Sequence, residues 1–561
     1  MDEPPNCVER RANVQFARQK PSLMVHVIVA VLGVFAALWS LAICLIGGFT
    51  LSLLGTTVRA HDPFRPLAVA VVCALIYAVT KGPLNVRRLI SPLAILLGLS
   101  TALAGIARNS WTAGGADSYA YVSQAELWLN GSLTVPVPLA ASAPWPDTVW
   151  TFSPHGFRPA VSEAALVPVT APGLPILMAG ANAIAGHCAM FLVTPLCGAL
   201  LVWVTFAIGR RLVSEIVGLG AAWLIATSPA VLAMLVSPMS DVPAAASWAA
   251  AVYFALGSSN ASSIAAGLAS SGAILIRPNL APLAAILVVW KLWAGLKPSA
   301  TDRLAFVRSA FVRPALLIAA GTIPGCLFIA WVNATLYGSP VLSGYGALSD
   351  LFSMSNVLTN LRRYGGWLIE SQTPLALVGI AALLVPIKAF GAVWRTPSQL
   401  RGAMLLGAMT TMVWALYLIY TPYDAWWFLR FLLPSWPAIC IGAAAVVVRI
   451  AQDRGRPLRS IAIILMLLVG GYGIQFAVRH GAFPSGEGDH RYVSIAKLVE
   501  QVTDPSAVVF AGQNGGPTRY YAGRTIVRFD LIEPEWIDRA AQWLTEHGRP
   551  PYFLLEDWDL P

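Results

Sequence analysis

Long apolar runs recur along almost the whole chain, and most of them are near 20 residues in length. Wound as a helix, a run of that length crosses the hydrocarbon core of a bilayer. The pattern predicts an all-α polytopic membrane protein with about thirteen transmembrane helices. The expected spans lie at about 25–48, 66–80, 88–107, 188–208, 216–236, 242–257, 262–276, 280–296, 314–334, 374–392, 402–420, 431–449 and 460–478.

The composition excludes the other broad classes. Of the 561 residues, 57% are hydrophobic and 11% are charged, against about 25% charged in a typical soluble protein. An ordinary cytosolic enzyme, a disordered chain and a fibrous repeat are therefore excluded. The seven cysteines form no CxxC pair and sit mostly in apolar runs, so the sequence indicates neither a disulfide framework nor a zinc site.

The distribution of Lys and Arg predicts the orientation. With the N-terminus placed inside and the spans alternating, most Lys and Arg residues fall on inside segments, as the positive-inside rule requires. This bias accounts for the net charge of +10 without a nucleic-acid partner. The apolar segment 166–186 would invert all later loops if it crossed the membrane. We therefore expect a helix at the outer interface, broken by Pro168, Pro172 and Pro175.

This topology predicts three parts. Residues 1–24 form a cytoplasmic N-terminal segment, and 25–478 form the transmembrane domain with its first large outer loop at 108–187. Residues 479–561 alternate apolar runs with a helical pattern near 533–547. This tail is expected to form a small α/β domain on the outer, periplasmic side. We expect a multi-pass protein of a bacterial inner membrane, with its C-terminus outside.

Two acidic residues stand where an apolar run ends on the outer side. Asp117 follows the third run in GGADSYAYVSQ, and Asp241 follows the fifth in SPMSDVPAAA. Ionisable residues at a membrane boundary usually have a task or a partner. The alternative for each is a helix cap, because Asp117 precedes a helical pattern and Asp241 precedes Val242-Pro243.

Basic and aromatic residues recur at the same boundary. Arg277 interrupts two apolar runs, and Arg430 lies in YDAWWFLRFLLPSWP. A guanidinium binds phosphate well because it stays charged and donates a planar fork of N–H groups. The alternative for both is a snorkelling or structural arginine. Trp427 fits either a membrane-interface belt or a sugar-packing surface. His155, in FSPHGFRP, is a lone loop histidine and a weaker candidate.

Together these motifs resemble the GT-C superfamily of integral-membrane glycosyltransferases, in the bacterial branch near the protein O-mannosyltransferases and the lipid A aminoarabinose transferase. The resemblance rests on GGADSYAY, APGLPILMAGA followed by GRRL, SPMSDVPAAA, IRPNLAPL and LRFLLPSWPAI, and it covers about residues 88–450. There is no Walker A loop, HExxH or GxSxG motif. The sequence therefore does not indicate a reaction driven by nucleotide hydrolysis.

The resemblance implies an inverting transfer from a polyprenyl-phosphate sugar to a hydroxyl of a lipid, glycan or protein on the outer face. It assigns the general base to Asp117. The guanidinium chemistry above makes Arg277, with Arg430 as a second candidate, the expected binding group for the donor phosphate. The other substrate-site candidates are Tyr119, Asp241, Trp427 and His155. Protein mannosyltransferases carry Asp-Glu where this chain has Asp117-Ser118, which puts a protein acceptor in doubt. We expect no metal or other cofactor, with a divalent metal as the alternative.

Three rival functions remain open from the sequence. One is a transporter or flippase for a lipid-linked glycan, whose signature would be charged residues at mid-membrane depth. Another is a non-catalytic membrane sensor that uses the outer tail, and the third is an inactive protein on the GT-C fold. The expected partners of the enzyme are the lipid-linked donor, the hydroxyl acceptor and membrane lipid, with no nucleic acid.

Overall fold

The structure is a computed structural model that divides into two compact units, Met1–Leu89 and Ile90–Pro561, described separately below. It describes residues 23–46, 49–53, 56–60, 65–66, 69–70, 72–73, 76, 87–161, 164–295, 312–385, 393–453, 456–483 and 490–556. Residues 1–22 of the expected cytoplasmic segment 1–24 and most of the expected span 66–80 lie outside these residues.

In the first unit, the first apolar run forms helix α1 (Leu23–Ile46). It is followed by an antiparallel pair of strands, β1 (Phe49–Leu53) and β2 (Thr56–Ala60), in which Phe49 pairs with Ala60 and Leu53 with Thr56. The apolar pattern of the sequence predicts no strands in this segment. Val, Thr and Phe, which favour strands, occupy much of this pair.

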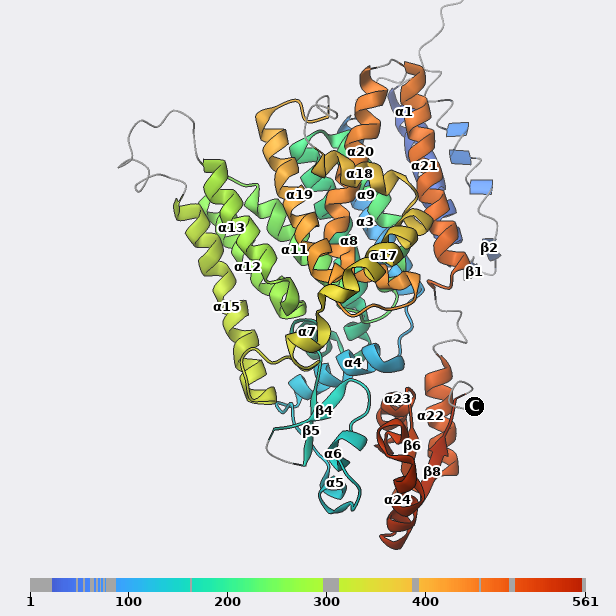
Figure 1. The fold of residues 1–561 in the computed structure, drawn as a ribbon. Coiled ribbons are helices and arrows are strands. Elements are labelled where there is room, and N and C mark those ends of the chain that lie inside the picture. The colour runs from blue at the N-terminus through green and yellow to red at the C-terminus, as the bar shows by residue number, and fades with distance from the viewer. Residues whose placement is uncertain are drawn as a thin grey trace, which may run out of the picture. The chain divides into compact units, whose positions relative to one another are not determined.

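The second unit is mainly helical (Figure 1). Its apolar helices follow the predicted runs closely, because a backbone in lipid must satisfy its hydrogen bonds within the segment itself. They are α3 (Arg87–Ala107, which begins in the first unit), α7 (Gly173–Ala185), α8 (Val193–Leu212), α9 (Glu215–Ala226), α10 (Pro229–Leu235), α11 (Asp241–Ala255), α12 (Asn260–Ile276), α13 (Pro282–Gly295), α15 (Val312–Tyr337), α18 (Leu375–Leu384), α19 (Pro397–Leu418), α20 (Trp436–Asp453) and α21 (Arg456–Arg479).

Shorter elements connect these helices. The helical ones are α4 (Gly115–Leu129), α5 (Pro138–Ser142), α6 (Thr148–Thr151), α16 (Leu348–Leu351), α17 (Val357–Gln372) and the 3₁₀ helices η1 (His187–Leu192), η2 (Pro278–Leu280), η3 (Met354–Asn356) and η4 (Trp426–Ser435). After α21 come α22 (His490–Val502), β6 (Val508–Ala511), α23 (Gly515–Ala522), β7 (Thr525–Val527), η5 (Phe529–Leu531), α24 (Pro534–Glu546) and β8 (Pro551–Leu554).

The predicted count of thirteen spans is not confirmed. Among the described residues, six helices are long and apolar enough to cross a membrane. They are Leu89–Ala107, His187–Leu212, Val312–Tyr337, Pro397–Leu418, Trp426–Asp453 and Leu458–Arg479. The run predicted as one span at 216–236 is the pair α9 and α10, bent by 58°, and it would be the seventh. Pro229 begins the second member, where its missing N–H costs no helical hydrogen bond.

The ambiguous segment 166–186 is not one interrupted helix. Residues Ala165–Pro168 form strand β5, and helix α7 begins only at Gly173. Pro175 falls in the first turn of α7, where proline is tolerated. The helix has 13 residues, or about 20 Å at 1.5 Å per residue, and is too short to cross a hydrocarbon core of about 30 Å. Asn109 Nδ2, just after α3, donates to the Phe191 carbonyl (2.8 Å), so both ends of the loop lie together.

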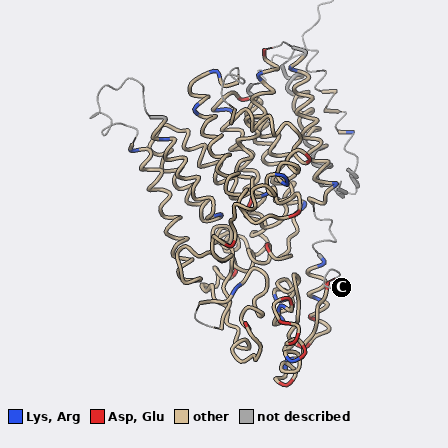
Figure 2. The backbone as a smooth tube through the Cα atoms, in the orientation of Figure 1, with Lys and Arg blue, Asp and Glu red and all other residues tan. Residues whose placement is uncertain are grey.

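Two small sheets lie outside the helical part. Strands β3 (Val135–Pro136) and β4 (Phe157–Pro159) flank β5 in an antiparallel sheet within the loop 108–187. Near the C-terminus, β7, β6 and β8 form a parallel sheet with β6 in the centre. Figure 2 shows that charged residues are sparse along α12, α13 and α15 and frequent in residues 490–556.

Candidate functional site

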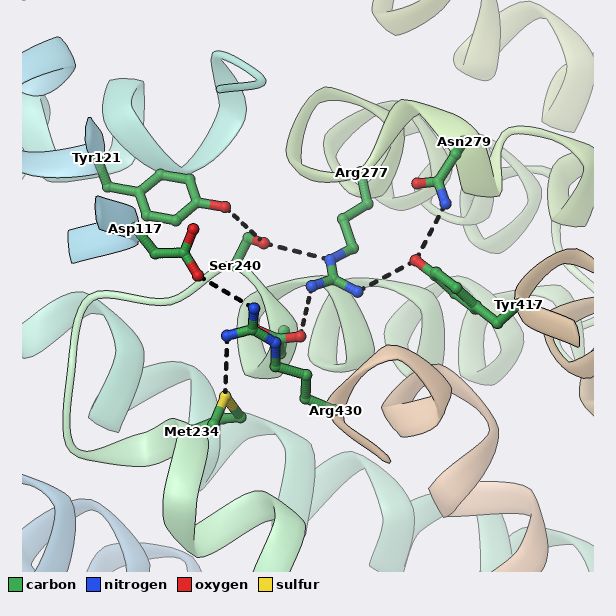
Figure 3. A network of polar contacts seen from close by, with 9 residues as sticks. Asp117, Tyr121, Met234, Ser240, Arg277, Asn279, Tyr417 and Arg430 are labelled. Carbon is green, nitrogen blue, oxygen red and sulfur yellow. Dashed lines mark hydrogen bonds and ion pairs between the residues drawn. The ribbon is translucent and has the colours of Figure 1, made fainter. Parts of the chain in front are cut away.

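A network of charged and hydroxyl side chains joins segments that are far apart in sequence, and four of these segments supply its charged residues (Figure 3). Asp117 comes from the first turn of α4 and Asp241 from the first turn of α11. Arg277 follows the last residue of α12, and Arg430 lies in η4. The structure thus brings together the four ionisable residues that the sequence placed at the outer ends of apolar runs.

The first ion pair joins Arg277 and Asp241. The two side chains form a close ion pair, and they are 11% and 0% exposed respectively. The other Arg277 nitrogens also have partners, since Nε donates to Ser240 Oγ (3.2 Å) and Nη1 to Tyr417 OH (3.1 Å). All three nitrogens of this guanidinium are therefore engaged, and the charge of Asp241 is balanced in a buried setting.

The second ion pair joins Arg430 and Asp117. Arg430 Nη2 lies 3.1 Å from Asp117 Oδ2, and the side chains are 15% and 45% exposed. Arg430 Nη1 also approaches Met234 Sδ at 4.0 Å. Among the described residues, Arg430 Nε and Asp241 Oδ2 are buried without a hydrogen-bond partner. Unsatisfied buried groups are costly, so their place beside the ion pairs is typical of a binding site.

Neither aspartate acts as the helix cap that the alternative interpretation allowed. Helix α4 begins at Gly115, so Asp117 is its third residue, and Asp241 is the first residue of α11, behind Ser240. No side-chain cap hydrogen bond is formed at either helix start. A carboxylate in the first turn is still favoured by the helix dipole. Both carboxylates bind arginines instead.

Four further polar side chains complete the network and were not predicted. Tyr121 OH donates to Ser240 Oγ (2.9 Å), and Asn279 Nδ2 donates to Tyr417 OH (3.0 Å). Tyr121 could have been found, because it lies four residues after Asp117 and hence on the same helical face. Tyr417 lies in an apolar span with no charge nearby, and no pattern marks it. Burial is the main reason that the pKa of Tyr121 is raised to about 12.

Aromatic rings lie against the two arginines. The Arg277 guanidinium lies 5.6 Å from the ring centre of Phe431, and that of Arg430 lies 5.1 Å from Phe428 and 5.4 Å from Phe431. Tyr417 stacks on Phe431 with 5.2 Å between ring centres. Cation–π contacts of this kind hold a guanidinium in place without consuming its N–H donors.

The remaining sequence candidates lie outside the network. Tyr119 is buried against Phe157 and Tyr520, and Trp427 is 44% exposed beside Trp426 and Phe428. His155 lies in a loop, where burial and then Arg528 lower its pKa while Asp530 opposes them. None of the three has a contact with Asp117, Asp241, Arg277 or Arg430 among the interactions of the described residues.

The described residues contain no group of three or more His, Cys, Asp and Glu arranged to hold a metal ion. The two site carboxylates are each paired with an arginine instead. A charge-balanced arrangement of this kind differs from a preformed cation site, which would gather several carboxylates without cations between them.

Long apolar helices with a buried polar network at one end define a polytopic membrane protein. No protein-family profile and no curated protein sequence matches the chain. Solved structures match it. The archaeal oligosaccharyltransferase AglB from Archaeoglobus fulgidus, in complex with an inhibitory peptide and a dolichol-phosphate, matches with a TM-score of 0.51 and 12% identity, over 84% of this chain and 69% of that chain.

A second similar structure is ArnT from Cupriavidus metallidurans bound to undecaprenyl phosphate. Its TM-score is 0.47 at 15% identity, with 82% of this chain and 89% of that chain covered. Both proteins are GT-C glycosyltransferases, the superfamily that the sequence motifs resemble. The similarity to AglB shows that the chain has this fold.

Proposed function

We propose that the chain is a glycosyltransferase that moves a sugar from a polyprenyl-phosphate donor to an acceptor hydroxyl on the outer face of the membrane. The observation that carries the proposal is the Asp117–Arg430 pair, beside the Arg277–Asp241 pair. It places a half-exposed carboxylate next to a guanidinium with a buried, unpartnered Nε. AglB, whose fold the chain shares, is described with a dolichol-phosphate, which supports a lipid phosphate as the donor group.

In the proposed reaction, Asp117 accepts the proton of the acceptor hydroxyl as its oxygen attacks the anomeric carbon. The bond between that carbon and the phosphate oxygen breaks, and the lipid phosphate leaves from the opposite face. A single displacement inverts the anomeric centre. The phosphate is already a good leaving group, so no nucleotide is needed at this step.

The two arginines have different proposed roles because their contacts differ. Arg430 has a free Nε and a partly exposed partner, so it can turn its donors to the departing phosphate and stabilise the developing charge. Arg277 has a partner at each nitrogen. It adds positive potential to the site and neutralises Asp241.

The test is transfer of radiolabelled sugar from polyprenyl phosphate by the purified protein in lipid, with a membrane extract as acceptor source. Asp117→Asn should lower turnover by about 10²–10⁴-fold, the usual contribution of a general base. The matched control is Asp424→Asn, because Asp424 is 83% exposed and pairs with Arg363 outside the network. Its turnover should equal that of the wild type.

The same transfer assay tests the proposed role of Arg430. Arg430→Gln should raise the KM for the donor and lower kcat, because both donor binding and leaving-group stabilisation are lost. More than a tenth of wild-type turnover in Asp117→Asn would refute the assignment of the base. Absence of transfer from every polyprenyl-phosphate sugar by a folded wild-type protein would contradict the proposed function and favour a transporter or sensor.

A further inference from the structure

The helix that carries Asp117 is contacted by the C-terminal segment, defined here as residues 490–556. The first contact is at the start of α4. The Ala113 backbone N–H donates to Tyr521 OH (2.8 Å). The Tyr492 ring lies against Gly114, where a Cβ atom would be only 2.7 Å from Tyr492 Cδ2. The next residue, Gly115, has a φ of +62°, which an L side chain would strain. Two tyrosines therefore hold the turn that precedes Asp117.

Further contacts extend along the helix. A Cβ atom on Gly516 would lie 2.4 Å from the Tyr119 ring, so only glycine allows α23 to approach α4 this closely. Tyr119 also meets Tyr520 edge-on, with 6.5 Å between ring centres. Tyr520 OH donates a hydrogen bond to the Glu126 carboxylate. The C-terminal segment therefore contacts α4 both at its start and near its end.

Helical geometry separates these contacts from the polar network. Asp117 and Tyr121 are four residues apart and share the face that meets Arg430 and Ser240. Tyr119 and Glu126 are seven residues apart and also share a face, about 160° from the first at 100° per residue. One face of α4 therefore contacts the polar network, and the opposite face packs against the C-terminal segment.

The tyrosines are held at a defined spacing by Arg524. This arginine is 8% exposed and joins the end of α22 to the end of α23. Its Nε donates to Thr503 Oγ1 (3.0 Å), and its other nitrogens donate to the carbonyls of Ala522, Glu500 and Thr503. Tyr492 lies on α22, and Tyr520 and Tyr521 lie on α23. The two helices therefore present their tyrosines to α4 as one unit.

From these contacts we propose that the C-terminal segment positions the general base, with Tyr521 and Tyr492 as its positioning residues. They act through the Ala113–Gly115 turn, which sets where α4 begins and hence where Asp117 stands. The inference rests on the proposed function. Neither tyrosine touches substrate. A displacement of about 1 Å at a reacting group costs up to about 10²-fold in rate, so a small loosening of this turn is enough to lower turnover.

The test compares Tyr521→Phe with wild type and with Tyr552→Phe, a matched control on β8 with no contact to α4 among the described interactions. Tyr521→Phe should lower kcat by about 10- to 100-fold. Its donor KM should stay within about twofold, because Arg277 and Arg430 belong to other elements. Hydrogen–deuterium exchange of the peptide covering residues 110–118 should be faster, because the Ala113 amide loses its acceptor.

A double-mutant cycle separates positioning from a general loss of structure. If Tyr521 acts through Asp117, Tyr521→Phe should change the residual turnover of Asp117→Asn by no more than about twofold. The same kcat loss in both backgrounds, or exchange at 110–118 equal to that of wild type, would overturn the proposal. A wild type without transfer activity would instead contradict the proposed function, and the exchange data would still show whether the tyrosine contacts hold the turn.

Discussion

At the residue scale, burial decides what each charge of the site does. Asp241 is completely buried, its ion-pair partner is Arg277, and Arg430 is a second cation close enough to interact with it. Asp117 is half exposed beside Arg430. Removal of one partner from a buried ion pair leaves an uncompensated charge, whereas a partly exposed pair is screened by water. The two aspartates should therefore respond differently to loss of their arginines.

Arg277→Ala should destabilise the protein by about 3–5 kcal/mol, because it leaves the buried Asp241 carboxylate without its ion-pair partner. The double variant Arg277→Ala with Asp241→Asn should recover much of that loss. Thermal unfolding in one detergent checks both. Arg395→Ala is the control, because its pair with Asp453 is 47% exposed at each partner and such pairs contribute about 0–1 kcal/mol. No recovery in the double variant would show that Arg277 stabilises the fold by other contacts.

His155 should make stability depend on pH. Its pKa is lowered, mainly by burial and then by Arg528, so the folded protein binds this proton less tightly than the unfolded chain. The contribution of His155 to the free energy of unfolding is then fully present above the unfolded-state pKa of about 6.5, and it is lost as the pH drops below that value. We expect the melting temperature to decrease from about pH 7 to pH 5, with a smaller slope in His155→Gln. Equal slopes would exclude this contribution.

The sequence indicated the charged site residues one at a time, but not their pairing. Asp117, Asp241, Arg277 and Arg430 stand out because charge is rare at the ends of apolar runs. Which carboxylate meets which guanidinium depends on how α4, α11, α12 and η4 pack, and no local pattern records that packing. Tyr417 and Asn279 were missed for the same reason, since neither is unusual in its own segment.

At the element scale, small residues allow α12 and α15 to pack closely. A Cβ atom on Gly267 would lie 2.5 Å from the Ile318 carbonyl oxygen, and one on Gly325 would lie 2.5 Å from Ser271 Oγ. Both helices carry small residues four positions apart, a spacing that brings backbones together in membranes. Since Arg277 directly follows the last residue of α12, this packing also positions the site.

Gly267→Ala should destabilise the protein by about 1–3 kcal/mol, because the added methyl group meets backbone that cannot move freely. Gly272→Ala on the same helix is the matched control, since no atom lies within 4 Å of a Cβ built there. That change should be neutral or favourable by up to about 1 kcal/mol. Thermal unfolding of both variants in the same detergent is the measurement. Equal effects would show that the close approach is unimportant.

The sequence predicted helices better than it predicted the strands of the outer loop. A run such as 314–334 forms α15 because its apolar composition and length both favour a long helix. Strands β3, β4 and β5 have two to four residues each, too few for an alternating pattern to appear. Their pairing depends on contacts between distant parts of the loop, which a single sequence does not display.

At the scale of the whole molecule, four candidate spans place one end against the site or against the loop 108–187 that carries Asp117. His187 lies 3.5 Å from Glu126, Tyr337 OH donates to the Pro168 carbonyl, and Tyr417 and Arg430 belong to the network. The opposite ends of the same spans carry basic residues. These are Arg210, Arg211, Arg313, Arg401 and Arg449. By the positive-inside rule, we propose that the opposite ends face the cytoplasm and the site faces outward.

This orientation predicts the result of labelling single cysteines with a membrane-impermeant thiol reagent in a cysteine-free background. Gln513→Cys in the C-terminal segment and Asn130→Cys after α4 should be labelled from outside, because both positions are exposed and their elements touch near the site. Gln452→Cys, also exposed, should be labelled only after the membrane is permeabilised.

The length of the span Trp426–Asp453 explains why positions 513 and 452 should be labelled from opposite sides of the membrane. The span Trp426–Asp453 carries Arg430 near one end and Gln452 near the other, about 30 Å apart along the helix. That distance equals the thickness of the hydrocarbon core, so one residue cannot lie at the outer surface without the other approaching the inner one. Labelling of positions 513 and 452 from the same side would contradict the orientation. Labelling of 452 alone from outside would invert it, and the proposed transfer would then take place at the cytoplasmic face.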